Sequence, residues 1–231
     1  MPATVPSVPG LDIVGGSSPA LEVGGDFFGY YRRENDDLGV AVGDVSGKGL
    51  PAALLMAVSV GILSSEVNRT DEPGDVLSHI DTVLEDYTRR NRLNTALCYV
   101  VLSRTQATFC VDAVNAGGIP PLLRRADGRA EWLEVSGLPL GIPDTGDVIR
   151  APRREEIRRG DVLVLSSDGV VEAMNARREV FGFDRFERAV AETHPEGGAA
   201  GVREEILAAM RAFGAGIPPH DDVTLVVIRV M

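Results

Sequence analysis

Residues 40–56 read VAVGDVSGKGLPAALLM, and the rest of the chain is organised around this stretch. An apolar run typical of a buried strand ends at Asp44, a loop with Gly47 and Gly49 follows, and Pro51 then opens a run of helix formers. The pattern predicts a strand, a turn and a helix, with Asp44 at the rigid end of the strand. Glycines in the loop allow the backbone to approach whatever Asp44 holds.

The glycine-rich loop does not have the spacing of a nucleotide-binding loop. A Walker-type loop requires four residues between its first Gly and the Gly-Lys pair, followed by Ser or Thr. Here only Asp44, Val45 and Ser46 separate Gly43 from the Gly-Lys pair, and another Gly follows the lysine. No Gly-x-Gly-x-x-Gly lies between a predicted strand and a predicted helix, which excludes a dinucleotide site of that type.

Composition favours one globular domain. A length of 231 residues with 44% hydrophobic content supports a sizeable core, and no linker-like stretch divides the chain. Residues 1–10 contain three prolines and a glycine, so we expect a flexible lead-in or the remnant of a linker there. Residues 11–231 are predicted to form a single domain.

Charge and hydropathy exclude several classes of partner. The formal net charge of -11 argues against binding to nucleic acid or to an anionic membrane surface. No apolar run approaches the roughly 20 residues that span a membrane, and the N-terminus lacks the basic and apolar regions of a signal peptide. We therefore expect a cytoplasmic protein in which a bound cation would be needed to attract a phosphorylated substrate.

The order of predicted elements indicates an α+β fold. The helix at 51–68 is apolar nearly all round and is expected to be well buried, whereas 73–92 has a stripe of apolar residues three and four apart. Residues 15–19 are expected to form a loop, and 147–157 and 161–165 are expected to pair. Because strands and helices come in blocks, we predict an αββα sandwich of two antiparallel β-sheets flanked by helices. The predicted strands are 11–14, 27–31, 38–42, 95–102, 107–114, 119–124, 131–135, 147–157, 161–165 and 223–230, and the remaining predicted helices are a short one after 168, 183–193 and 199–213.

The two cysteines lie on a predicted hairpin. A turn at residues 103–106 places Cys98 opposite Val111, so Cys98 and Cys110 point to opposite faces of the sheet. We expect two free thiols.

Aspartates recur where predicted strands begin or end. A single one of them would be read as a turn residue or a helix cap. Several carboxylates that converge without basic partners repel one another, so a buried cluster requires cations. Oxygen ligands without accompanying His and Cys favour Mg²⁺ or Mn²⁺ over Zn²⁺. The candidate metal ligands are Asp26, Asp44, Asp168, Asp221 and Asp222.

The chain resembles the metal-dependent protein serine/threonine phosphatases of the protein phosphatase 2C (PPM) superfamily, and within it the bacterial SpoIIE/RsbU-like branch. The resemblance covers residues 8 to 231. Four motifs carry it in order: 23–28 (VGGDFF), 43–54 (GDVSGKGLPAAL), 167–173 (SDGVVEA) and 221–224 (DDVT), with weaker support from 115–120 (NAGGIP) and 137–141 (GLPLG).

The resemblance implies a site for two divalent cations, Mn²⁺ or Mg²⁺, at one end of the sandwich. In this assignment Asp44 bridges both cations and, with Asp168, carries the catalytic role. Asp168 and Asp221 complete the ligands of one cation, and Asp26 and the backbone carbonyl of Val45 serve the other. Asp222 is the alternative to Asp221, because adjacent carboxylates leave the register open.

The activity implied by the resemblance is hydrolysis of a phosphoserine or phosphothreonine monoester by direct attack of a metal-bridging water. The implied substrate is an anti-sigma-factor antagonist in a bacterial partner-switching pathway. A catalytically weak pseudophosphatase and a metal-binding interaction module are the alternatives. The helices at 51–92 are expected to form a homodimer face or a face for a regulatory partner.

Two positions depart from the family pattern, and the donor of the leaving-group proton stays open. Family members commonly carry His where Gly118 stands, and the eukaryotic branch has His at the position of Ser46. His220 beside the acidic pair is a candidate substitute, although a loop histidine is more often solvated; His79 and His194 have weaker claims. Lys48 is either a contact to the substrate phosphate or a solvated loop lysine.

Overall fold

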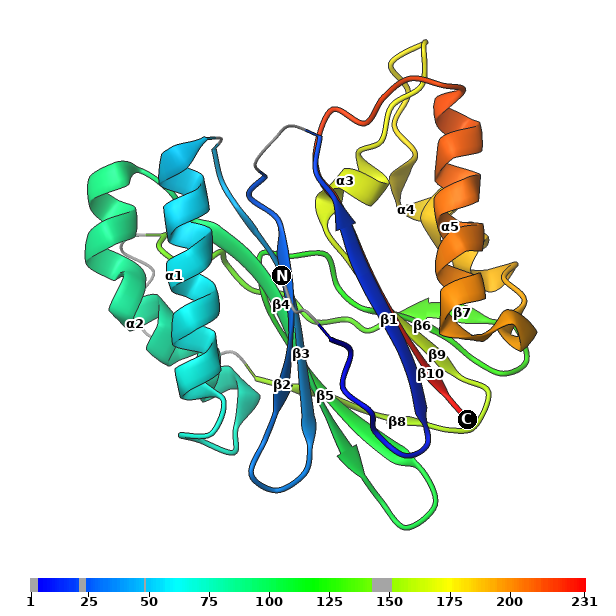
Figure 1. The fold of residues 1–231 in the computed structure, drawn as a ribbon, viewed down its shortest axis with the longest axis horizontal. Coiled ribbons are helices and arrows are strands. Elements are labelled where there is room, and N and C mark those ends of the chain that lie inside the picture. The colour runs from blue at the N-terminus through cyan, green and yellow to red at the C-terminus, as the bar shows by residue number, and fades with distance from the viewer. Residues whose placement is uncertain (1–3, 21–23, 48, 143–150) are drawn as a thin grey trace.

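A computed structural model describes residues 4–20, 24–47, 49–142 and 151–231. Within these residues, two five-stranded antiparallel sheets lie face to face with helices on their outer faces (Figure 1). The first sheet has the order β1 (Leu11–Ser18), β10 (Val223–Val230), β9 (Val162–Ser166), β6 (Leu122–Arg124), β7 (Ala130–Trp132). The second has the order β2 (Phe27–Arg32), β3 (Leu38–Val45), β4 (Thr95–Arg104), β5 (Phe109–Ala116), β8 (Arg153–Ile157). The predicted αββα sandwich is confirmed.

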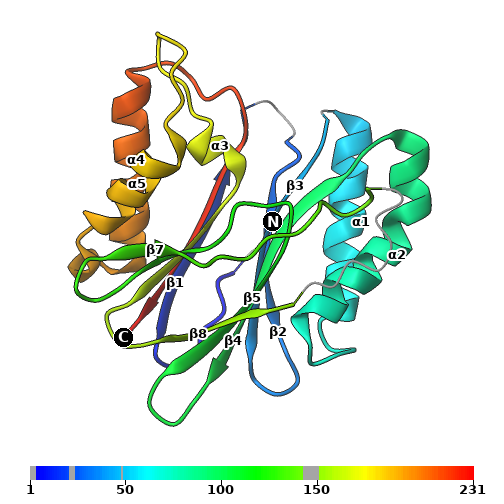
Figure 2. The ribbon, with the colours of Figure 1, turned by 180° about the vertical axis from the view of Figure 1, so that it is seen from behind.

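The helices form the two outer layers. α1 (Leu50–Glu66) and α2 (Pro73–Asn91) cover the second sheet, as the views from both sides show (Figures 1 and 2). The first sheet is covered by α3 (Asp168–Val171), α4 (Gly182–Ala191), the 3-10 turn η1 (Pro195–Gly197) and α5 (Gly198–Gly214). α1 begins as expected, because Gly47 and Gly49 adopt positive φ of 90° and 81° and Pro51 lies in the first turn.

Alternation along the strands divides the core into three layers. On β3, Val40 and Val42 pack between the sheets, whereas Ala41 and Val45 face α1 and α2. β10 alternates in the same way between the inter-sheet layer and the layer under α4 and α5. Asp44 continues the inward-facing set of β3, so its carboxylate lies at the open end of the space between the sheets.

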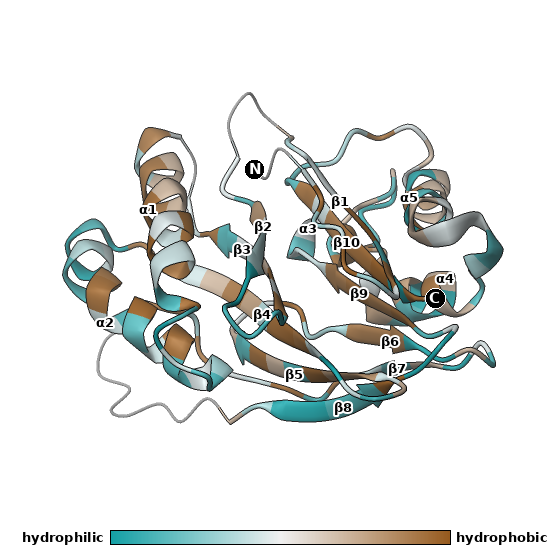
Figure 3. Ribbon diagram, turned by 60° about the horizontal axis from the view of Figure 1, so that its bottom comes forward, coloured by the Kyte–Doolittle hydropathy of each residue, from teal (hydrophilic) through white to brown (hydrophobic). Residues whose placement is uncertain are grey.

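The edge strand β8 is protected by charge. Its sequence RREEI colours as hydrophilic in Figure 3, which discourages pairing with another chain. Next to it, the Arg125 guanidinium donates to Glu131 (2.7 Å), Glu155 (2.6 Å) and Asp161 (3.2 Å). Since Glu131 belongs to the first sheet and Glu155 to the second, this network joins the two sheet edges.

The structure corrects several strand predictions. Residues 15–18 continue β1 rather than forming a loop, because they pair with 223–226 of β10. The segments 153–157 and 162–166 do not pair with each other: β8 pairs with β5, and β9 pairs with β10 and β6. The connection between them crosses from one sheet to the other. The first part of the predicted strand 147–157 lies outside the described residues.

The hairpin register around the cysteines also differs from the prediction. Arg104 pairs with Phe109, so Cys98 lies opposite Asn115 and not Val111. The turn is later by two residues than expected. The conclusion is unaffected, since both cysteines are free thiols.

The helix α1 is less buried than its composition predicted. Leu54 is 50% exposed, Val58 is 48% exposed, and Leu50 at the first position is also exposed. These residues are four apart and lie on the face turned away from the second sheet, whereas Leu55 and Leu63 are buried against it. The stripe of α2 is confirmed at Val76, Leu77, Ile80 and Leu84, while Val83 is exposed. No helix in the described part of the chain is long and apolar enough to cross a membrane.

Candidate metal centre

Three carboxylates from distant parts of the sequence meet at one end of the sandwich. Asp26 directly precedes β2, Asp44 is the penultimate residue of β3, and Asp168 opens α3 after β9. One oxygen from each of the three carboxylates lies within 4.8 Å of the others. Antiparallel pairing of Phe27 with Gly43 puts Asp26 beside Asp44 as predicted, and the packing of the two sheets adds Asp168.

The ionised form of the cluster is strongly disfavoured. Burial raises the pKa of Asp26 to about 7, with further contributions from the Asp222 and Asp168 charges. Burial raises the pKa of Asp44 to about 8, and the charges of neighbouring aspartates add to this effect. The pKa of Asp168 is raised mainly by burial and by Glu172. These shifts are typical of carboxylates that converge without a compensating cation.

The residues present fit divalent cations. Asp26 is 4% exposed, and its Oδ2 is buried without a hydrogen-bond partner. No ion pair within the described ranges involves Asp26, Asp44 or Asp168. An all-oxygen set of this kind suits Mg²⁺ or Mn²⁺. A cation would supply the missing partner of the orphaned oxygen and relieve the repulsion.

A glycine leaves room beside the carboxylates. A Cβ on Gly25 would lie 2.6 Å from the carbonyl oxygen of Val45 and 2.8 Å from Oδ1 of Asp44. The Val45 carbonyl oxygen and the Asp44 carboxylate therefore border one small space beside Gly25. Gly43 is needed for a different reason, because a Cβ there would meet the Phe27 ring at 2.4 Å.

The acidic pair stands immediately before β10. Asp222 is buried and Asp221 is partly exposed. Neither belongs to the compact group of three. Both charges act on Asp44, however, and each raises its pKa. The pair therefore flanks the group formed by Asp26, Asp44 and Asp168.

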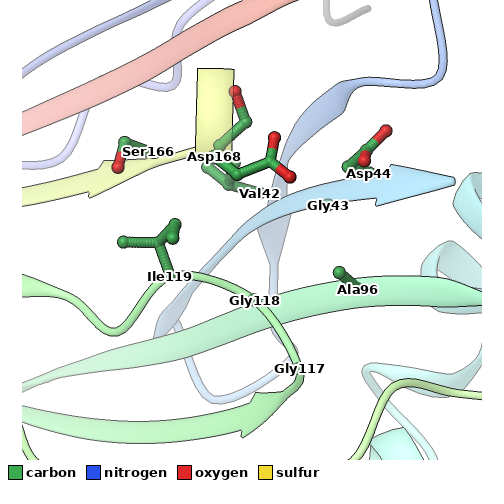
Figure 4. A pocket seen from close by; sticks show the side chains of 10 residues that line it. Val42, Gly43, Asp44, Ala96, Gly117, Gly118, Ile119, Ser166 and Asp168 are labelled. Carbon is green, nitrogen blue, oxygen red and sulfur yellow. The ribbon is translucent and has the colours of Figure 1, made fainter. Parts of the chain in front are cut away.

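A small pocket opens next to Asp44 and Asp168 (Figure 4). Most of its walls are apolar side chains or glycine backbone, and the two serines at the end of β9 are the polar part. Besides the two aspartates, the lining residues are Val42, Gly43, Ala96, Gly117, Gly118, Ile119, Ser166 and Ser167. At the departure from the family pattern, Asn115 holds the loop: it accepts the Gly118 N–H at 2.8 Å and donates to the Gly118 carbonyl at 2.8 Å. Asn115 has a role that was not predicted, although its place at the head of the 115–120 motif was a signal.

Other candidates take structural positions. The Ser46 hydroxyl accepts the Asn94 N–H at 2.8 Å, so it anchors the loop after β3. His79 lies 3.3 Å from Glu66 on the helix layer, and His194 lies 3.1 Å from Glu205. His220 is exposed in the loop before the acidic pair. Lys48 lies outside the described residues.

Ser167 and Thr224 were missed by sequence reasoning. Their hydroxyl groups lie beside the Asp26 carboxylate and partly offset the effect of burial on its pKa. Ser167 Oγ also accepts the Thr224 N–H at 3.0 Å. Both residues fall within the motifs 167–173 and 221–224, so motif membership was the available signal.

Comparison with known proteins identifies the family. The model of the SpoIIE family (Stage II sporulation protein E) matches residues 34–231. The chain belongs to the SpoIIE family. Phosphoserine phosphatase RsbU of Bacillus subtilis is 28% identical over 228 residues, which cover 97% of this chain and 65% of RsbU. Phosphoserine phosphatase RsbP of the same organism is 23% identical, with coverage of 90% and 50%. This SpoIIE-family chain thus spans between half and two thirds of these relatives.

Solved structures share the fold. The RsbU and RsbW domains of Rv1364c from Mycobacterium tuberculosis match with a TM-score of 0.80 and 26% identity, over 97% of this chain and 61% of that chain. The PP2C phosphatase domain of SpoIIE from Bacillus subtilis matches with a TM-score of 0.75 at 20% identity, over 95% and 63% of the two chains. The architecture of this SpoIIE-family chain is therefore that of PP2C phosphatase domains.

Proposed function

We propose that residues 11–231 form a metal-dependent protein phosphatase domain that hydrolyses a phosphoserine or phosphothreonine monoester. The observation that carries the proposal is the group of three converging carboxylates, one of them buried with an unpartnered oxygen, in a chain of the SpoIIE family. Asp26, Asp44 and Asp168 would hold two divalent cations, Mn²⁺ or Mg²⁺, together with the Val45 carbonyl and one member of the acidic pair. Bound cations would lower the pKa of a water nucleophile and offset charge on the phosphoryl oxygens.

The residues of this chain fix the positions of the carboxylates and surround them with a low-dielectric interior. Asp44 pairs with Ala96 of β4, and on the other side of β3 the pairing with β2 reaches the preceding Gly43. Asp168 is placed by the end of β9, where the Ser167 N–H donates to the Thr224 carbonyl at 3.0 Å. Such rigid placement on strand ends suits a site in which catalysis depends on orientation rather than on a covalent intermediate.

The substrate we propose is an anti-sigma-factor antagonist of a partner-switching pathway. Support comes from the likeness to RsbU and RsbP, both named phosphoserine phosphatases, and from the structure in which an RsbU domain accompanies an RsbW domain. The net charge of -11 means that a phosphorylated partner would need the cations to approach.

The exposed stripe on α1 supports an interaction face on the helix layer. Leu50, Leu54 and Val58 follow one another at four-residue spacing, and Val83 of α2 is exposed as well. Apolar side chains at this spacing suit the packing of another helix. We include in the proposal that α1 and α2 form a homodimer face or the face for a regulatory partner.

Hydrolysis of an aryl phosphate tests the proposed activity. Wild type and Asp44→Asn are compared with Mn²⁺ and with EDTA. We expect Mn²⁺-dependent turnover in wild type that falls by at least about a hundredfold in the variant, because the central carboxylate is lost. Mn²⁺ binding without turnover in wild type would refute the proposal and favour a pseudophosphatase or a metal-binding interaction module.

A further inference from the structure

The carboxylate of Asp222 is occupied by peptide groups of the connection between β1 and β2. Its Oδ1 accepts the Ala20 N–H at 2.8 Å, and its Oδ2 accepts the Asp26 N–H at 3.4 Å. Asp222 itself is 5% exposed. The two hydrogen bonds join the residue before β10 to Ala20, near the end of β1, and to Asp26, just before β2. The second bond thus holds the backbone of a proposed metal ligand.

Close packing leaves Asp222 little freedom to turn toward a cation. A Cβ on Gly24 would lie 1.7 Å from Oδ2 of Asp222, so the Gly24 backbone lies directly against the carboxylate. On the other side, a Cβ on Gly169 would lie 1.9 Å from the Asp222 carbonyl oxygen. This packing explains why glycine precedes Asp26 by two residues and follows Asp168 directly.

The backbone of Asp222 is also attached to the strand end that carries Asp168. Ser167 Oγ donates to the Asp222 carbonyl at 3.4 Å and accepts the Thr224 N–H at 3.0 Å. Asp222 thus contacts the segment before Asp26 through its side chain and the segment before Asp168 through its main chain. Asp222 therefore connects the start of β2, beside Asp26, with the end of β9, beside Asp168, and these two strands belong to different sheets.

We propose that Asp222 is a positioning residue, which fixes the Asp26 backbone through its peptide hydrogen bonds, and is not a ligand of the cations. This inference rests on the proposed metal-dependent function. This pair of hydrogen bonds requires a carboxylate at position 222. Both partners are N–H donors, and a carboxylate offers each of them an acceptor oxygen. An asparagine at position 222 would present one acceptor and one amide donor, and it would lose one of the two bonds.

Calorimetric titration with Mn²⁺ and amide hydrogen exchange test the two parts of the proposal separately. The proteins are wild type, Asp221→Asn, Asp222→Asn and Asp222→Ala of the full chain. We expect Asp221→Asn to bind one equivalent of Mn²⁺ fewer than wild type. Asp222→Asn should keep the wild-type stoichiometry with about tenfold weaker binding, as for groups that orient a ligand, and Asp222→Ala should bind more weakly still.

Exchange of the Ala20 and Asp26 amides in the metal-free proteins gives a readout independent of activity. Exchange of the Ala20 or the Asp26 amide should become about tenfold faster in Asp222→Asn, which loses one of the two acceptors, and both should stay unchanged in Asp221→Asn. Loss of a Mn²⁺ equivalent in Asp222→Asn with unchanged exchange of both amides would overturn the proposal.

The near-isosteric Asp222→Asn keeps the test valid if Asp222→Ala does not fold. Should wild type bind no Mn²⁺, the proposed function fails. The exchange measurement would then still decide whether Asp222 holds the Asp26 backbone.

Discussion

Replacement of Asp44 by Asn should stabilise the metal-free protein, although it removes the central proposed ligand. Burial and neighbouring charges raise the pKa of Asp44 from 3.8 to about 8 in the folded state. Folding at neutral pH therefore requires either protonation of this group or burial of an unfavourable charge. Asparagine has nearly the same shape and carries no charge, so it avoids this cost.

The pH dependence follows from the direction of the shift. Because the folded-state pKa is raised, the favourable contribution of Asp44 is fully present below its unfolded-state pKa of 3.8 and is lost as the pH rises to about 8. The free energy of unfolding of the wild type falls across this window by the Asp44 contribution, and the variant has no such contribution to lose. The gap between the two proteins should open from pH 4 to pH 8 and then stay constant.

The magnitude can be bounded from the same two values. A tenfold change in an ionisation equilibrium corresponds to about 1.4 kcal/mol, so the change from 3.8 to about 8 allows at most about 6 kcal/mol. Asp44 is partly exposed, and solvent screening reduces the expected gain to about 2–3 kcal/mol at pH 8. For a domain of this size, a gain of that size raises Tm by about 5–10 °C.

Thermal and urea unfolding in EDTA and in Mn²⁺ give the assay. Asp44→Asn should be the more stable protein in EDTA and the less stable one in saturating Mn²⁺, because only the wild type gains the full binding free energy. Asp184→Asn is the matched control, since this aspartate is exposed on α4 and the same substitution there should change stability little. A variant that is less stable than wild type in EDTA at pH 8 would refute the reasoning.

Three further predictions follow from other parts of the structure. Gly25→Ala should weaken Mn²⁺ binding at least about tenfold in a titration, since its Cβ would lie 2.6 Å from the Val45 carbonyl oxygen. Gly61→Ala is the control: its Cβ would have no atom within 4 Å, so it should bind Mn²⁺ normally and raise the free energy of unfolding by about 1 kcal/mol. Equal Mn²⁺ binding by the two variants would contradict the need for space beside Gly25. Leu54→Glu should leave the aryl phosphatase rate unchanged but abolish self-association or response to a regulator in sedimentation and activity assays, and an unaltered response would exclude this face. Arg125→Ala should lower the free energy of unfolding by about 2–3 kcal/mol, because it leaves the buried carboxylate of Asp161 without its cation. Arg158→Ala removes an exposed arginine and should change the free energy of unfolding little; similar losses in the two variants would show that the sheet edges are not joined by this network.

Local pattern predicted most of the helices and strands, although it placed residues 15–18 in a loop rather than in β1. The strand, glycine loop and Pro51 around Asp44 predicted β3 and α1, and the final strand was predicted with its observed bounds. Apolar alternation and helical spacing are properties of neighbouring residues, so they can be read without tertiary information. The four acidic motifs were recognised by their resemblance to the family, in the order in which they stand along the chain.

Pairing partners were decided by the tertiary structure. Periodicity does not show which strand lies beside which, and so β8 and β9 were expected to pair although they belong to different sheets. The two-residue error at the hairpin arose because turn position, not strand pattern, sets register. The exposed stripe of α1 had the same apolar composition as its buried face, and only packing against the second sheet separates them.

The sequence by itself determined which carboxylates could form a metal site, and the tertiary structure decided which of them converge and what each one contacts. Asp221 and Asp222 are chemically identical and adjacent, so no pattern distinguishes them. The Ala20 and Asp26 N–H groups reach Asp222 only because β10 lies beside β1 in the folded sheet. Convergence of Asp26, Asp44 and Asp168 likewise depends on two sheets meeting at one end, which is a long-range property of the chain.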